Sequence, residues 1–310
     1  MVYPTRDMRI VSLLPAATEI VAALGLTDAL VGVSHECDFP PEVATKPRVT
    51  RSPIHSGLSS AEIDARVKAS LDETGELYTL DEGLLERLRP DVLLTQGLCD
   101  VCAPTLASVS AVAARLPGPP RVVDLDPRSL SDILTDVRTT GAALGVGDRA
   151  ARVVAGLEAR IDAVRAGVTG APRRRCVLLE WIDPPYRGGH WDPELVEIAG
   201  GVDPVGRAGE DSTAVRWEEI VAAAPEVLVL ACCGCDVART RQDLPALRAQ
   251  PGWATLPAVT SGQVYAVDGT AYFSRPGPRI VDSLEILAEL IHPERFAGRF
   301  PDRGVVRVES

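Results

Sequence analysis

The alternation of apolar and polar positions predicts one long amphipathic helix in the middle of the chain, over residues 148–168. Its apolar positions recur at helical spacing and are Val153, Val154, Leu157, Ile161, Val164 and Val168. Gly147 precedes the pattern, and Gly170 with Pro172 ends it. At about 1.5 Å per residue the helix extends roughly 30 Å. We therefore expect it to brace two halves of the chain.

Short apolar runs alternate with helical patterns on both sides of this helix. The predicted strands are 9–14, 30–33, 92–95 and 122–125 before it, and 176–181, 227–230 and 264–267 after it. Such alternation is typical of parallel sheets covered by helices. We predict an α/β protein with two three-layer lobes, an N-terminal lobe over residues 1–147 and a C-terminal lobe over residues 169–310, joined by the backbone helix 148–168. The tail after Pro293 is expected to be loosely held.

Charge and composition exclude several function classes. A formal net charge of -11 argues against nucleic acid and against anionic membrane surfaces as partners. No run of about 18 apolar residues is present to span a bilayer. The N-terminus shows no export signal, so the expected location is cytoplasmic. Seven cysteines without such a signal favour thiols or metal ligands over disulfides.

Candidate metal ligands stand directly after predicted strands, where ligands of parallel α/β sheets collect. They are His35, Cys37, Cys99, Cys102, Cys232, Cys233 and Cys235. Thiolate and imidazole groups hold zinc, iron or iron-sulfur clusters, and a C-x-x-C spacing lets two thiolates reach one ion. Two alternatives stay open for the cysteines, because buried thiols pack as small apolar groups and paired thiols carry out redox chemistry.

Aromatic side chains are scarce, and several of them gather in two strand-exit loops of the C-terminal half. The candidate ligand-binding residues are Tyr186, His190, Trp191, Tyr272 and Phe273, together with Glu36 beside the first metal candidates. Such rings wall a pocket for a flat or bulky ligand, or else they pack between the lobes. His292 is expected at the surface. The phosphate-binding and nucleophile-elbow motifs are missing, so no catalytic residue is assigned.

Seven motifs follow one another along nearly the whole chain. They are RIVSLLPAATEIVAALGL, LVGVSHECDFPPEV, LRPDVLLTQG, EWIDPPYRGGHW, ELVEIAGGVD, APEVLVL and AYFSRPGPRIVDSLEILAELI. In this order they resemble the vitamin cobalamin-binding (BtuF-like), class III periplasmic substrate-binding proteins of ABC importers. The resemblance implies a TroA-like clamshell with a helical backbone, and a corrinoid, a siderophore or a metal ion held between its lobes.

The same resemblance implies particular residue roles. Glu82 and Glu218 are similar in place to the glutamates with which such proteins dock on an ABC permease. Tyr186 and Tyr272, with Phe273 beside the latter, are similar in position to the aromatic walls of cobalamin binders. The chain differs from the family by an insertion around residues 56–78 and by the missing export signal. That missing signal indicates a cytoplasmic branch of the family and argues against a permease partner.

The leading hypothesis is therefore a soluble substrate-binding protein, not an enzyme, that holds a corrinoid or another metal-containing ligand. The alternative is a metalloprotein or metalloenzyme with a Cys/His-bound zinc ion or iron-sulfur cluster in the same cleft.

Overall fold

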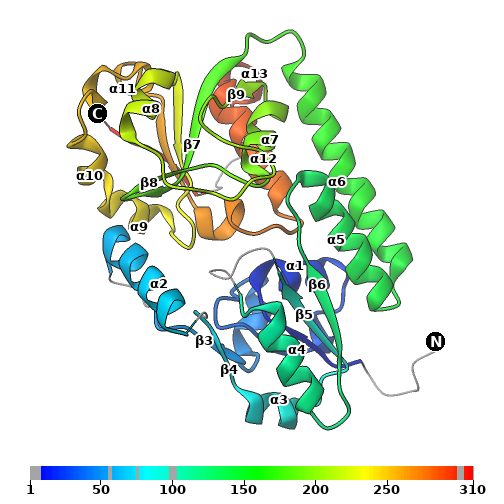
Figure 1. Cartoon of the computed structure of the whole chain (residues 1–310). Helices are drawn as coiled ribbons and strands as arrows, with labels where there is room; N and C mark the ends of the chain where they lie inside the picture. Colours follow the sequence, from blue (N-terminus) through cyan, green and yellow to red (C-terminus); the bar gives the residue numbers. More distant parts are fainter. Residues whose placement is uncertain (1–7, 55–57, 75–76, 98–102, 299–303, 310) are drawn as a thin grey trace. The chain divides into compact units, whose positions relative to one another are not determined.

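A computed structural model describes residues 8–54, 58–74, 77–97, 103–298 and 304–309. The chain forms two compact units (Figure 1). Unit 1 comprises Met1–Gly57, Ala65–Pro127 and Leu134–Val154, and unit 2 comprises Leu58–Asp64, Arg128–Ile133 and Ala155–Ser310. Both units are built of sheets and helices, as predicted.

Unit 1 is organised around a four-stranded sheet in the order β2-β1-β5-β6. Its strands are β1 Ile10–Ser12, β2 Leu30–Val33, β5 Val92–Gln96 and β6 Arg121–Leu125, and each neighbouring pair is parallel. Strands β1 and β5 are buried along their whole length, as expected for strands covered on both faces. Because the strands are parallel, the loops that follow them leave from one edge of the sheet.

Helices and short segments cover this sheet. The helices are α1 Pro15–Ala23, α3 Glu82–Leu88, α4 Leu106–Arg115 and α5 Leu130–Ala143, with short helical turns η1 Thr27–Ala29 and η2 Pro41–Thr45 and a small hairpin of β3 Thr50–Arg51 and β4 Thr79–Leu80. Helix α2 Ser60–Thr74 begins in unit 2 and ends in unit 1. Asp81 and Thr105 cap the first turns of α3 and α4 through side-chain oxygens, because those amides have no partner within the helix.

Unit 2 contains a larger sheet in the order β12-β11-β10-β7-β8, with β9 paired to β7. The strands are β7 Arg174–Ile182, β8 Pro185–Arg187, β9 Gly201–Val202, β10 Val227–Leu230, β11 Val264–Val267 and β12 Val305–Arg307. Strand β10 is parallel to both β7 and β11, whereas β8 and β12 run antiparallel to their neighbours. The carboxyl ends of the three central strands therefore share one edge.

Nine helical segments accompany this sheet in the described part of unit 2 beyond α6. They are α7 Asp192–Ile198, α8 Trp217–Ala223, α9 Val237–Gln242, α10 Leu244–Arg248, η3 Trp253–Thr255, α11 Pro257–Thr260, the π-helix η4 Gly269–Phe273, α12 Ile280–Ile291 and α13 Pro293–Phe296. Helix α12 is the most deeply buried of them, and ten of its twelve residues are buried. Its buried residues are mostly apolar, with Ser283 and Glu285 as the polar exceptions.

The long helix α6 spans Gly147–Val168 and runs from unit 1 into unit 2 (Figure 1, green). It begins one residue earlier than the sequence pattern predicts. Its apolar stripe is buried at Val154, Leu157, Ile161 and Val164. Near its end, the ring of Phe296 packs so closely on Gly167 that a Cβ there would lie 2.5 Å from the ring. The predicted α/β architecture with one long helix is confirmed.

The tail corrects two sequence expectations. Pro293–Phe296 form α13, whose Phe296 is buried, and Val305–Arg307 pair with β11 as β12, so these described parts of the tail are held by the fold. His292 is fully buried rather than at the surface, and its Nε2 lies 3.3 Å from the carbonyl oxygen of Gly200. The pattern before Pro293 does not reveal these contacts.

A buried ion pair joins α6 to α12. The Arg160 guanidinium donates to both carboxylate oxygens of Glu285, at 2.9 Å and 2.6 Å, and also to Asp282. The Glu285 side chain is 8% exposed, whereas that of Arg160 is 37% exposed. Hydrogen bonds to Glu285 raise the pKa of Arg160 further above its usual range. This fork-shaped contact fixes the register of α12 against α6.

We predict that Arg160→Ala lowers the free energy of unfolding by about 2 kcal/mol, because it leaves the Glu285 carboxylate buried without its cation. Urea unfolding at pH 7 measures the change. Arg165→Ala on the same helix is the matched control. Its pair with Asp162 is exposed at 3.3 Å, and its loss is expected to cost less than about 0.5 kcal/mol. Equal losses in the two variants would contradict the structural role of Arg160.

Candidate functional site

The carboxyl edge of the unit 1 sheet presents His35, which follows β2 directly. Its backbone N–H donates to the Thr50 hydroxyl at 3.0 Å, and its Nδ1 lies 2.7 Å from the same oxygen. The Thr50 hydroxyl itself donates to Ser34 at 3.0 Å, so its oxygen accepts the proton of Nδ1. This assignment leaves Nε2 of His35 unprotonated, with a lone pair directed away from Thr50.

The electrostatics around His35 favour its neutral form. Burial, and then the positive charge of Arg48, lower the pKa of His35 below its usual value. Arg48 is held nearby because its guanidinium donates to the carbonyl oxygens of Ser34 and Cys37, at 3.0 Å and 2.6 Å. A neutral, oriented imidazole is the form that binds transition metals.

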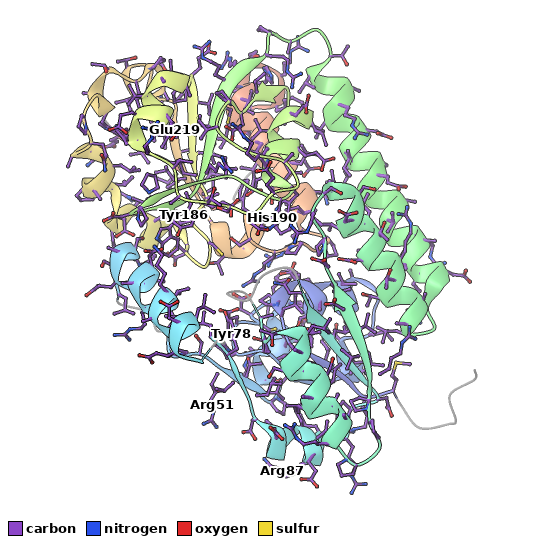
Figure 2. All side chains as sticks on the ribbon, in the orientation of Figure 1. Arg51, Tyr78, Arg87, Tyr186, His190 and Glu219 are labelled. Atoms are coloured by element: carbon purple, nitrogen blue, oxygen red, sulfur yellow. The ribbon has the colours of Figure 1, made fainter. Side chains whose placement is uncertain are left out.

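Tyr78 and Glu36 complete a small donor group with His35. The Tyr78 hydroxyl donates to Oε1 of Glu36 at 3.0 Å, and the same oxygen lies 4.0 Å from Nε2 of His35. The Tyr78 and His35 ring centroids are 5.5 Å apart, and Tyr78 is labelled in Figure 2. The sequence analysis missed Tyr78, because 42 residues separate it from Glu36 and only the end of the insertion marked its position.

Of the cysteine candidates of unit 1, the structure describes only Cys37, which packs in the core. Cys37 is 1% exposed, and its Sγ lies 3.1 Å from the Thr18 hydroxyl, among core residues. Cys99 and Cys102 lie outside the described residues. The described residues hold no cluster of three or more His, Cys, Asp or Glu side chains placed to bind a metal ion.

The carboxyl edge of unit 2 presents Tyr186 and His190, both labelled in Figure 2. The Tyr186 hydroxyl donates to Asp64 at 3.0 Å. His190 has a positive φ of 47°, its N–H donates to the carbonyl of Glu210 at 2.7 Å, and its Nε2 lies 3.3 Å from Asp211. A non-glycine residue in this backbone region is held there by its surroundings.

Of three aromatic candidates, two are buried in the core and one is partly exposed. Trp191 and Phe273 are buried at 6% and 1% exposure, and the Trp191 indole N–H donates to the carbonyl of Phe273 at 3.0 Å. These two rings pack in the interior of unit 2. Tyr272 is partly exposed, and the Arg279 guanidinium lies 5.5 Å from its ring centroid. Of the three, Tyr272 is therefore the ring that remains accessible from solvent.

The three cysteines after β10 also differ in burial. Cys232 and Cys235 belong to the apolar core of unit 2, whereas Cys233 is exposed. Burial raises the pKa of Cys232 far above its usual value and that of Cys235 to about 12. Thiols with such pKa values stay protonated at neutral pH, and metal binding requires the thiolate. This placement favours the core-packing alternative for Cys232 and Cys235.

A pair of carboxyl groups that the sequence analysis missed lies behind the His190 loop. Glu180 stands near the end of β7, and Asp192, which is 3% exposed, begins α7. Burial raises the pKa of Glu180 to about 6, and burial, followed by the charge of Glu180, raises that of Asp192. The sequence shows only an acidic residue at a strand end and another at a helix start.

The two predicted docking glutamates occupy equivalent places in their own units. Glu82 is in the first turn of α3 and accepts a hydrogen bond from Arg115 at 2.7 Å, while its side chain stays 52% exposed. Glu218 is in the first turn of α8 and is exposed. Carboxylates are favoured at helix N-termini by the helix dipole, with or without a docking role.

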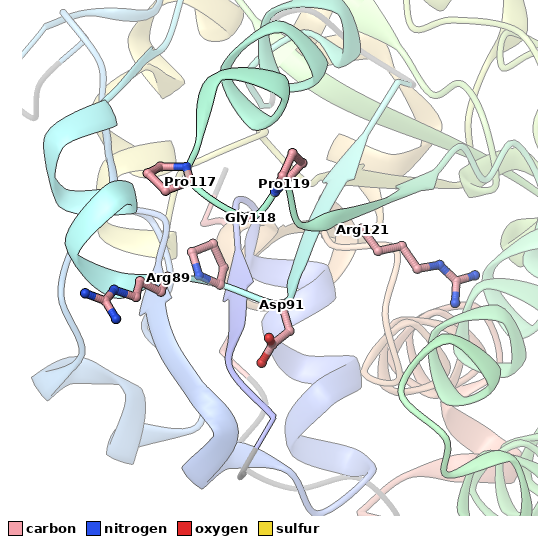
Figure 3. A pocket seen from close by; sticks show the side chains of 7 residues that line it. Arg89, Asp91, Pro117, Gly118, Pro119 and Arg121 are labelled. Atoms are coloured by element: carbon pink, nitrogen blue, oxygen red, sulfur yellow. The ribbon is translucent and has the colours of Figure 1, made fainter. Parts of the chain in front are cut away.

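A hollow of ≈ 480 Å³ lies at the other edge of the unit 1 sheet (Figure 3). It is lined by Arg89, Pro90, Asp91, Pro117, Gly118, Pro119 and Arg121, where β5 and β6 begin. The Asp91 carboxylate already accepts the backbone N–H of Arg9 at 2.8 Å. This hollow contains none of the predicted site residues.

Taken with the fold, these two carboxyl edges define the class of a two-lobed α/β binding protein with a connecting helix. Residues 10–271 match the periplasmic binding protein family, and the chain belongs to it. The family resemblance predicted from the seven motifs is confirmed. Its members are binding proteins of ABC transporters rather than enzymes, so the expectation of a non-enzyme is confirmed too.

Individual relatives are similar over nearly their full length. An uncharacterized ABC transporter substrate-binding lipoprotein of Bacillus subtilis (strain 168) is 25% identical over 295 residues, covering 93% of this chain and 81% of that protein. The structure of the periplasmic heme-binding protein RhuT from Roseiflexus sp. RS-1 is 25% identical, with a TM-score of 0.68, and covers 93% of this chain and 99% of that one. The periplasmic vitamin B12 binding protein BtuF of Vibrio cholerae shares the fold at 22% identity and a TM-score of 0.65, covering 92% and 96%.

The relatives correct the expected location. A cytoplasmic protein was expected from the absence of an export signal, but the chain belongs to a family of periplasmic binding proteins, and the Bacillus relative is a substrate-binding lipoprotein. The cytoplasmic assignment is therefore wrong. Among the described helices, none combines the length and the apolar character needed to cross a bilayer.

We predict that iodoacetamide labels Cys233 in the folded protein but not Cys232 or Cys235, because only Cys233 is exposed and the other two thiols resist ionisation. Peptide mapping by tandem mass spectrometry locates the label. Labelling of all three after unfolding in guanidinium is the control. Increased labelling of Cys232 or Cys235 after treatment with EDTA would indicate metal-bound thiolates instead.

We predict that Asp192→Asn stabilises the protein at pH 7.5 but not at pH 4.5. The raised pKa of Glu180 means that the folded state keeps its proton up to about pH 6, while the unfolded state loses it near 4.5. Stability from these acids is therefore lost as pH rises, at a cost of about 2 kcal/mol for Glu180 alone. Burial raises the pKa of Asp192 as well, and Asn at this position has no acidic proton to keep, so its part of the cost is removed and a gain of at least about 1 kcal/mol is expected at pH 7.5.

Urea unfolding of wild type and Asp192→Asn at pH 4.5, 6.0 and 7.5 measures this difference. Glu226→Gln is the control, because the Glu226 side chain is only partly buried, at 41% exposure, and pairs with Arg175. A stability difference that stays the same at the three pH values would show that the carboxyl pair does not bind protons as described.

Proposed function

We propose that this protein is the substrate-binding component of an ABC importer for a metal tetrapyrrole, a heme or a corrinoid. The observation that carries the proposal is the oriented, neutral His35 at the carboxyl edge of unit 1, with Tyr78 and Glu36 beside it. The solved structures of similar fold include a heme-binding protein and a vitamin B12 binding protein, which supports the same ligand class.

His35 is the first candidate for an axial ligand to the chelated metal. Thr50 fixes its ring through Nδ1, and this outer hydrogen bond makes Nε2 the basic nitrogen. Imidazole suits both iron and cobalt. The lowered pKa of His35 keeps Nε2 available without competition from a proton at neutral pH.

Tyr78 and Glu36 supply a second, harder donor set. The Tyr78 hydroxyl already donates to the Glu36 carboxylate at 3.0 Å, so Glu36 is placed to take the phenol proton if the phenolate binds a ferric ion. Phenolate and carboxylate oxygens prefer the more highly charged, harder metal ions. This arrangement favours an oxidised metal centre in the ligand.

Unit 2, considered by itself, presents an aromatic surface in the Tyr272 loop. Tyr272 is a partly exposed ring with the Arg279 guanidinium 5.5 Å from its centroid. A flat ring system stacks on such an aromatic surface, and guanidinium groups pair with carboxylate side chains of a ligand. Of the two ligand types, a heme with its propionates fits these charges better than a neutral corrinoid.

The proposed partner is an ABC permease that contacts Glu82 and Glu218. Both side chains are exposed in the first turn of a short helix, one in each unit. Carboxylates so placed are available to arginine side chains of a membrane partner. The Cys99 and Cys102 pair remains a candidate for contact with the ligand metal.

We predict that the purified protein shifts the absorption spectrum of hemin or of aquacobalamin at low micromolar concentration. His35→Ala is expected to weaken binding at least tenfold, about 1.4 kcal/mol, and Tyr78→Phe to weaken it less and change the spectrum. Tyr265→Phe is the matched control, because Tyr265 pairs with Gln263 on β11 away from the proposed site. The proposal fails if neither chelate binds, or if His35→Ala binds as tightly as wild type while remaining folded by circular dichroism.

A further inference from the structure

The first turn of helix α2 is part of unit 2. Leu58–Asp64 belong to unit 2, although the segments before and after them, Met1–Gly57 and Ala65–Pro127, belong to unit 1. Among the described side chains of α2, only Ser60 is buried, at 1% exposure. The beginning of this helix is therefore its anchored part.

Two charged residues at the end of α9 build the anchor. The Arg239 guanidinium donates to the carbonyl oxygen of Leu58 at 2.8 Å and to Oδ2 of Asp243 at 2.8 Å. The Ser60 hydroxyl donates to the same Asp243 oxygen. The side chains of Arg239 and Asp243 are only 16% and 13% exposed, so water competes little for these charge-assisted hydrogen bonds. They fix the place of the first turn of α2 within unit 2.

The anchored turn accepts hydrogen bonds from two neighbouring aromatic side chains. Trp181 on β7 pairs with Tyr186 on β8, so the two side chains lie on the same face of this hairpin. The Trp181 indole N–H donates to the carbonyl oxygen of Ser60 at 3.3 Å, and the Tyr186 hydroxyl donates to Oδ1 of Asp64 at 3.0 Å. Ser60 and Asp64 are four residues apart, which places them on one face of α2. The anchor that fixes Ser60 thus also fixes the acceptor of Tyr186.

A fixed acceptor restricts the Tyr186 ring before any ligand arrives. Strand β8 is at the edge of its sheet, and the Tyr186 side chain is only partly buried. The hydrogen bond to Asp64 holds the far end of this ring and so selects one orientation for it. A ring that is ordered in advance stacks on a flat ligand without losing further freedom on binding.

We propose that Asp64 is a positioning residue for ligand binding, which orders the Tyr186 ring for contact with a metal tetrapyrrole. The contact of Ser60 with Asp243 and Arg239 holds Asp64 in place. This gives the insertion around residues 56–78 a role in the binding surface of unit 2. The inference rests on the proposed function for the class of the ligand. The contact between Asp64 and Tyr186 is testable without any ligand.

Tyrosine labelled with ¹³C at the ring carbon that bears the hydroxyl reports this contact by NMR. The chain has five tyrosines, and the signal of Tyr186 is the one that Tyr186→Phe removes. Asp64→Ala is expected to move this signal, because the phenol loses its carboxylate acceptor, and Ser60→Ala to move it less far in the same direction. Asp72→Ala, at an exposed position of the same helix, should leave it in place. A Tyr186 signal unmoved in Asp64→Ala overturns the inference, and one unmoved in Ser60→Ala overturns the role of the anchor.

Binding of hemin and of aquacobalamin to the full chain is then measured at pH 7. Asp64→Ala is expected to bind about fivefold more weakly than wild type, whereas Asp64→Asn, which keeps an oxygen acceptor for Tyr186, stays within about twofold of it. Tyr186→Phe should lose about as much as Asp64→Ala, and the double variant no more than either, because all three lack the same hydrogen bond. Asp72→Ala should bind as wild type does.

The outcomes separate this inference from the proposed function. Unchanged affinity in Asp64→Ala, an equal loss in Asp64→Asn, or losses that add in the double variant overturn the positioning role and leave the proposed function standing. A Tyr186 signal that responds to Asp64→Ala in a protein that binds neither chelate removes the proposed function and the positioning role with it, while the contact itself stands.

Discussion

Parallel strand pairing is the constraint on which the site depends. In unit 1, β1 lies between β2 and β5, and β10 in unit 2 lies between β7 and β11, all in parallel. The residues that follow these strands must then emerge at a common edge, whatever their distance in sequence. His35 in unit 1, after β2, and the Tyr272 loop in unit 2, after β11, owe their placement to this rule, whereas His190 follows the antiparallel strand β8. The shared fold of binding proteins with different ligands follows from it too, because the loops vary while the pairing stays the same.

Within each edge, short polar contacts decide what a side chain can do. Thr50 selects the tautomer of His35 because its hydroxyl proton is already given to Ser34. A residue that does not contact the ligand thus sets the geometry of one that is proposed to bind it.

The sequence predicted the elements better than the contacts. The helix found at Gly147–Val168 and the strands follow from apolar periodicity, which depends only on neighbours along the chain. Tyr78 and the Glu180–Asp192 pair were missed because they depend on the meeting of distant segments. Trp191 and Phe273 were expected in a pocket wall, but large apolar rings gain more free energy when fully buried, and both are core residues. The cytoplasmic location was predicted wrongly because the folded residues themselves do not show in which compartment the protein resides.

Acidic side chains inside unit 2 are stabilised in two different ways. Glu285 is neutralised by Arg160, whose guanidinium keeps its charge at every physiological pH, so this contact holds α12 on α6 unconditionally. Burial raises the pKa of both Glu180 and Asp192, so each acid is shifted towards its neutral form. A fixed cation keeps a buried carboxylate charged at every physiological pH, whereas burial favours the protonated acid. The contact along the long helix is therefore insensitive to pH, while the charge of Glu180 varies with pH.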